Sequence, residues 1–146
     1  MTEGRTLVLS VDRDDDIGWK AKVDSPAVGR DACLNAANTL ALADPEDSDV
    51  NAIFSAVKLY DELIANNEDA EIAVIAGNHL NMIEGDRRIA KSLKQVVGET
   101  GVTDCILVTD GADPAGLVAA VREVPRRLVF AGSRPGGRES GTTLPA

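Results

Sequence analysis

Short, uninterrupted apolar runs that end abruptly in polar residues constrain the fold of this chain more than any other feature. Residues 6–11, 71–76 and 104–109 share this form, and residues 127–131 make a weaker fourth run. An apolar run without alternation is typical of a strand that is covered on both faces, as in a parallel sheet. The sequence therefore predicts a mainly parallel sheet of about four strands.

Helical patterns separate these runs. Residues 30–43 are rich in Ala and Leu, and apolar residues within 50–64 and 89–97 recur at spacings of three and four. Asp86 is the expected N-cap of the helix that contains 89–97, and a further helix is predicted over 114–124. The alternation of strands and helices predicts an α/β fold, a three-layer α/β/α Rossmann-like domain.

Length and composition bound the class of protein. A chain of 146 residues that is 44% hydrophobic can bury one core, so residues 1–131 are predicted to form a single domain and the Gly/Arg/Ser-rich residues 132–146 a flexible tail. The net charge of -9 argues against nucleic-acid binding. The excess of Asp over Glu and of Arg over Lys suggests a halophilic origin. Without a secretion signal or an apolar stretch long enough for a membrane span, we expect a cytoplasmic protein.

An acidic segment, residues 12–16, follows the first apolar run at once. Ligands of parallel sheets bind beyond the carboxyl ends of the strands, and carboxylates this close repel one another unless a cation lies among them. In an extended turn Asp12, Asp14 and Asp16 project to one side and offer oxygen ligands for Mg²⁺, Mn²⁺ or Ca²⁺. The alternative is a solvated loop whose Asp side chains cap turns and pair with neighbouring basic residues.

The loop after the third run adds candidates to the same edge. Asp110 follows that run directly, and with Asp113 it would complete a divalent-metal site, although Asp113 serves equally well as a helix N-cap. If the two strands are parallel neighbours, the carboxylates of Asp12 and Asp110 lie about one strand spacing, ~4.8 Å, apart plus side-chain reach. We therefore expect Asn at either position to abolish cation binding and to leave folding intact.

Four further residues are candidates for binding a small phosphate-containing ligand: Lys20, Arg30, His79 and Asp86. Lys20 or Arg30 would neutralise the phosphate. His79 is the single histidine, the residue type that acts most often as an acid or base near neutral pH, although a solvated loop histidine is the alternative interpretation. Asp86 would mark a helix N-terminus that holds an anion, and a plain N-cap is the alternative.

The polar segment 43–51 breaks one helix and starts the next. The simpler interpretation is a turn in which Asp47 or Ser48 caps the second helix. The other interpretation is a loop that folds over the acidic edge, so that Asp47, Asp49 or Asn51 reaches the site. A turn needs only one or two of these polar residues, so both interpretations stay open.

Several segments together resemble the archaeal family called domain of unknown function 373: residues 12–18, 29–30, 40–54, 58–63, 86–90 and 110–113. The resemblance implies a lineage without an established activity. It also implies longer relatives, predicted to be membrane proteins, in which a soluble N-terminal region precedes hydrophobic spans. This chain carries no such spans, so membrane association is expected only in those relatives.

The leading hypothesis is an acidic divalent-metal site that acts in phosphate-ester or nucleotide chemistry, where the metal polarises a phosphoryl oxygen. The first alternative is a non-catalytic ligand-sensing or interaction domain, which needs the same acidic edge but no general acid or base. The second is a scaffold that forms a homodimer.

Overall fold

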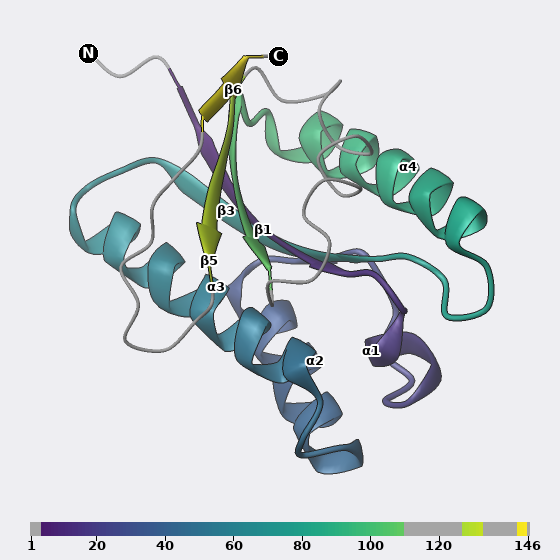
Figure 1. Cartoon of the computed structure of the whole chain (residues 1–146). Coiled ribbons are helices and arrows are strands. Elements are labelled where there is room, and N and C mark those ends of the chain that lie inside the picture. Colours follow the sequence, from purple (N-terminus) through teal and green to yellow (C-terminus); the bar gives the residue numbers. More distant parts are fainter. Residues whose placement is uncertain (1–3, 110–126, 133–142, 146) are drawn as a thin grey trace.

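The computed structural model describes residues 4–109, 127–132 and 143–145 (Figure 1). In chain order the elements are β1 (Thr6–Asp12), α1 (Asp16–Trp19), β2 (Ala27–Val28), α2 (Arg30–Ala43), α3 (Ser48–Ala65), β3 (Ala70–Ala76), α4 (Met82–Thr100), β4 (Asp104–Thr109), β5 (Arg127–Gly132) and β6 (Thr143–Pro145). All four predicted strands are present, as are three of the predicted helices. The helix expected over 114–124 lies outside the described residues.

The strands form one sheet in the order β2-β3-β1-β4-β5-β6. The four predicted strands are consecutive in this sheet and pair in parallel, whereas β2 and β6 are antiparallel to their neighbours. The sheet is therefore mixed, where the sequence predicted a mainly parallel one. The edge strands β2 and β6 have only two and three residues, which is too short to form an apolar run that the sequence could reveal. Strand β6 also lies within the segment that was predicted to be a flexible tail.

Helices lie on both faces of the sheet: α2 and α3 on one side and α4 on the other (Figure 1). Along β1, Leu7, Leu9 and Val11 belong to the core under α4, whereas Val8 belongs to the core under α2 and α3. Two cores that share one strand explain why its apolar run does not alternate. Within the part of the chain that the structure describes, no helix combines the length and apolarity needed to cross a bilayer.

The helix caps test two sequence predictions. Asp47 caps α3 by accepting a hydrogen bond from the backbone N–H of Asp49 at 2.9 Å, which confirms one of the two caps proposed there. The prediction that Asp86 caps α4 is wrong, because Asn81 occupies that position and accepts from the backbone N–H of Glu84 at 3.0 Å. The first three residues of α4, Met82 to Glu84, are exposed, so the apolar periodicity that marks the helix in the sequence starts later than the helix itself.

Candidate metal centre

Strand β1 ends where the direction of the chain connections reverses. From β1 the chain passes through α2 and α3 to β3 on one side, and from β3 it passes through α4 to β4 on the other side. In parallel α/β sheets such a switch point opens a crevice beyond the carboxyl ends of the strands. Asp12, the last residue of β1, lies at this point.

Asp12 is only 1% exposed, and the backbone of α1 holds its carboxylate. One oxygen accepts from the N–H of Asp16 at 2.9 Å and the other from the N–H of Ile17 at 2.8 Å. The chain can turn back in this way because Asp15, just before α1, adopts a left-handed conformation with φ 58°. Burial raises the pKa of Asp12, while the two backbone donors oppose that rise.

Three carboxylates meet at this place. Oxygens of Asp12, Asp16 and Asp49 all lie within 4.8 Å of one another; we call these residues the acidic cluster. Asp12 comes from the end of β1, Asp16 from α1 and Asp49 from the first turn of α3. The structure therefore brings two of the predicted metal ligands together with a residue that was named only in the alternative interpretation of segment 43–51.

The closeness of the cluster changes its titration. Burial, followed by the negative charges of Asp12 and Asp47, raises the pKa of Asp49 to about 10. Burial, followed by the hydrogen bond with Asp47, raises the pKa of Asp16 to about 6. At neutral pH without a cation, the cluster therefore retains at least one proton.

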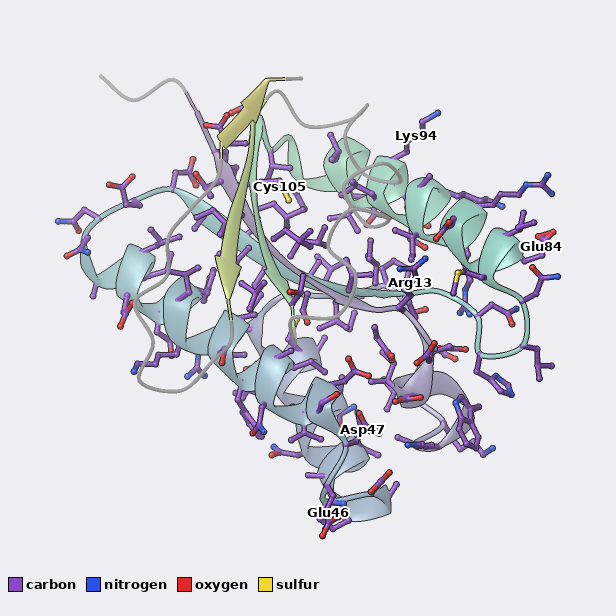
Figure 2. The ribbon with its side chains drawn as sticks, in the orientation of Figure 1. Arg13, Glu46, Asp47, Glu84, Lys94 and Cys105 are labelled. Atoms are coloured by element: carbon purple, nitrogen blue, oxygen red, sulfur yellow. The ribbon has the colours of Figure 1, made fainter. Side chains whose placement is uncertain are left out.

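Among the described contacts, Lys20 is the basic residue nearest to the acidic cluster. Its ammonium group, however, donates its hydrogen bonds to carboxylates outside the cluster. Its Nζ donates to Asp44 and to Asp47, both at 2.8 Å, and lies 3.8 Å from Asp16. Although burial opposes it, hydrogen bonds from Asp16 and Lys20 lower the pKa of Asp47. Figure 2 shows Asp47 at the start of α3. Lys20, predicted to neutralise a phosphate, therefore borders the cluster as a partner of acidic residues.

A second basic residue, Arg88 of α4, pairs with Asp15, a half-buried carboxylate of the loop. Its Nη1 donates to Asp15 at 3.0 Å and to the carbonyl of Gly77 at 2.8 Å, and its Nη2 donates to the hydroxyl of Ser25 at 3.0 Å. Asp14 is exposed and lies outside the acidic cluster. Asp110 and Asp113 lie outside the described residues.

The other predicted ligand-binding residues are dispersed. Arg30 makes two hydrogen bonds to Asp61, at 2.8 and 2.9 Å, and Asp61 is twelve residues, about 18 Å, further along α3 than the cluster. Asp86 lies 3.5 Å from Arg13 Nη2, and Figure 2 shows Arg13 between β1 and α4. The structure brings neither Arg30 nor Asp86 into the acidic cluster.

His79 is connected to the cluster through Trp19. The two rings stack with their centroids 4.8 Å apart, and Trp19 Nε1 donates to Asp16 at 3.2 Å. A cavity of about 210 Å³ opens beside His79, and Arg13, Asn78 and Asn81 contribute to its lining. This cavity is large enough for a group the size of a phosphate.

Comparisons with known proteins identify relatives but no activity. The family model described as domain of unknown function (DUF373) matches residues 5–126. An uncharacterized protein of Archaeoglobus fulgidus is 48% identical over 109 residues, which cover 75% of this chain and 32% of that protein. An uncharacterized protein of Methanocaldococcus jannaschii is 57% identical over 72 residues, which cover 49% of this chain and 20% of that protein. The chain thus spans a third or less of these relatives, and no solved structure matches it.

Proposed function

The chain belongs to the family described as domain of unknown function DUF373, which specifies no reaction, and from the geometry of its acidic cluster we propose that it binds a divalent cation, Mg²⁺ or Mn²⁺. Asp12, Asp16 and Asp49 are the proposed ligands. The observation that carries this proposal is the approach of three carboxylate oxygens to within 4.8 Å of one another. Carboxylate oxygen is the ligand type that hard divalent cations prefer.

The spacing suits a cation of this kind. Opposite oxygens around Mg²⁺ are about 4.2 Å apart, and around Ca²⁺ about 4.8 Å apart, given their usual bond lengths. Three ligands of an octahedral cation include at most one opposite pair, and adjacent oxygens around Mg²⁺ are about 3 Å apart, so the carboxylates of the cluster would move closer together to bind it. The two backbone N–H groups that hold Asp12 fix one ligand before the cation arrives.

Protons and cations compete for the same oxygens. Burial, followed by the negative charges of Asp12 and Asp47, raises the pKa of Asp49 to about 10, so the three carboxylates are not all ionised at neutral pH without a compensating positive charge. A bound divalent cation would supply that charge and release the proton. Proton release on cation binding is therefore expected near neutral pH.

The proposed role of the cation is to hold a small phosphate-containing ligand at the switch point. The cavity beside His79 and the bridge from Trp19 to Asp16 support a ligand that extends from the cluster toward the loop after β3. The parallel central strands and helices on both faces support the finer assignment of a Rossmann-like, three-layer domain. Metal-dependent phosphate-ester or nucleotide chemistry is the catalytic form of this proposal.

A ligand-sensing domain without turnover is the second candidate. This candidate is favoured because the residues that would assist catalysis already contact other side chains: Lys20 bonds to Asp44 and Asp47, and His79 stacks on Trp19. Steady hydrolysis of generic phosphate esters with Mg²⁺ or Mn²⁺, lost in Asp49→Asn, would establish the catalytic form. Cation-dependent ligand binding without hydrolysis would establish sensing.

Isothermal titration calorimetry with Mg²⁺ and Mn²⁺ tests the cation site. Asp16→Asn and Asp49→Asn should each weaken binding strongly, since each removes a ligand. Asp14→Asn is the matched control for Asp16→Asn, because it makes the same substitution two residues away, outside the cluster. Equal losses in all three variants would mean that the loop attracts cations only by its overall charge, and the proposal would fail.

We also propose that the domain acts in the cytoplasm and forms a homodimer. The exposed apolar segment at the start of α4 supports the dimer, with Leu80 83%, Met82 63% and Ile83 68% exposed. A monomeric mass by sedimentation at micromolar concentration would contradict it.

A further inference from the structure

We propose that Arg88 is the positioning residue of the acidic cluster: it holds α1 so that Asp12 and Asp16 face one another. This assignment rests on the proposed cation site, because it concerns the affinity of that site. Arg88 lies in α4, on the opposite face of the sheet from α3, and it was not among the candidates that the sequence supplied.

Arg88 joins three separate segments. Its guanidinium donates to the carboxylate of Asp15 before α1, to the carbonyl of Gly77 after β3 and to the hydroxyl of Ser25 before β2. These distances are 2.8 to 3.0 Å. A planar guanidinium with several donors in fixed directions can hold three acceptors in this way, whereas a lysine ammonium lacks that geometry.

The segment that it anchors has little stability of its own. Helix α1 contains four residues, and a single turn does not form in isolation. Asp15, which starts it, is in a left-handed conformation that non-glycine residues rarely adopt. The carboxylate of Asp15 also lies across Gly18, where an added Cβ would be 2.4 Å from its Oδ1. The hydrogen bond from Arg88 to Asp15 therefore stabilises this turn through a residue of another helix.

This turn builds the cation site. Its backbone N–H groups bind the carboxylate of Asp12, and its first residue is Asp16. Arg88 also compensates the charge of Asp15, whose side chain is only 16% exposed, so this carboxylate does not compete for the cation. Loss of Arg88 would free α1 and leave a partly buried carboxylate without its cationic partner.

Arg88→Met tests the assignment, with Arg87→Met as the matched control. Arg87 is the next residue of α4, is exposed and contacts Glu84 of its own helix. The expected result is binding of Mn²⁺ about 10- to 100-fold weaker in Arg88→Met, as for other residues that orient metal ligands, and no change in Arg87→Met. Arg88→Lys keeps the charge without the planar fork and should recover part of the affinity.

A second measurement, without cation, separates this proposal from the cation site. If Arg88 holds α1 in place, the backbone amides of Asp16 and Ile17, which donate to Asp12, should exchange with solvent faster in Arg88→Met than in Arg87→Met, as measured by NMR. Absence of Mn²⁺ binding to the wild type would refute the cation site, and the amide exchange would then decide the role of Arg88 alone. Unchanged affinity, or unchanged amide exchange where no cation binds, would refute the role of Arg88. If Arg88→Met does not fold, the same two measurements on Arg88→Lys test the role of Arg88, and values equal to those of the wild type would refute it.

Discussion

Replacing Asp49 with Asn removes a proton-binding carboxyl group while nearly keeping its shape. Burial, followed by the charges of Asp12 and Asp47, raises the pKa of Asp49 from 3.8 to about 10. Between these values the folded, cation-free protein holds a proton that the unfolded chain has released. Because the folded pKa is raised, the stability that this proton provides is complete at low pH and is lost as the pH rises toward 10.

The size of the effect follows from one proton. A difference of one bound proton changes the free energy of unfolding by about 1.4 kcal/mol per pH unit. The cation-free wild type should therefore lose about 2.7 kcal/mol between pH 6 and pH 8 through this group, and Asp49→Asn should lose none of it. Asp16, with its pKa raised to about 6, adds a smaller slope near pH 6.

Urea unfolding at pH 6, 7 and 8 with EDTA measures these free energies. Asp61→Asn is the matched control on the same helix: its hydrogen bond to Arg30 lowers the pKa of Asp61, so this group stays ionised throughout the range. The control should keep the slope of the wild type. Parallel pH dependence in the wild type and Asp49→Asn would refute the reasoning, because it would show that no proton is held by Asp49.

Three other perturbations follow from the structure. Lys20→Met should tighten Mn²⁺ binding about fivefold by calorimetry, since it removes a positive charge that lies 3.8 Å from Asp16. Gly77→Ala should lower the free energy of unfolding in urea by about 1–3 kcal/mol, because a Cβ at this position would be 2.3 Å from the carbonyl oxygen of Arg13. Added KCl should raise the thermal midpoint of the protein, since screening weakens the repulsion within a chain of net charge -9, and an unchanged midpoint would count against a halophilic origin.

The framework of the fold could be predicted because its signals are local. Helix α2 (Arg30–Ala43) and strand β4 (Asp104–Thr109) have the bounds that the sequence indicated, since a proline follows the first and polar residues flank the second. Strand β2 could not be predicted, because its two residues pair with β3 and nothing in their own sequence distinguishes them from a loop. The cap of α4 was misplaced because its first turn packs no apolar side chain into the core.

The members of the acidic cluster could be predicted only in part from the sequence, because the alternation of Asp residues is an imperfect guide to the path of a turn. Asp12, Asp14 and Asp16 would project to one side only if the chain stayed extended after β1. Instead Asp15 adopts a left-handed conformation and α1 begins at once, so Asp16 folds back over Asp12 while Asp14 faces solvent. The glycine at 18, three residues after Asp15, is the local signal of this turn, because the carboxylate of Asp15 occupies the place of a side chain there.

The third member of the acidic cluster depends on how acidic and basic residues pair across the fold. Segments 12–16 and 44–49 carry more carboxylates than a turn or a cap requires, and this surplus is visible in the sequence. Two basic residues pair with the other carboxylates of these segments: Lys20 donates to Asp44 and Asp47, and Arg88 donates to Asp15. Asp49 belongs to the cluster because the cap formed by Asp47 orients the first turn of α3. The number of surplus carboxylates can thus be counted from the sequence. Which of them form the acidic cluster depends on basic partners that only the folded chain brings close to them.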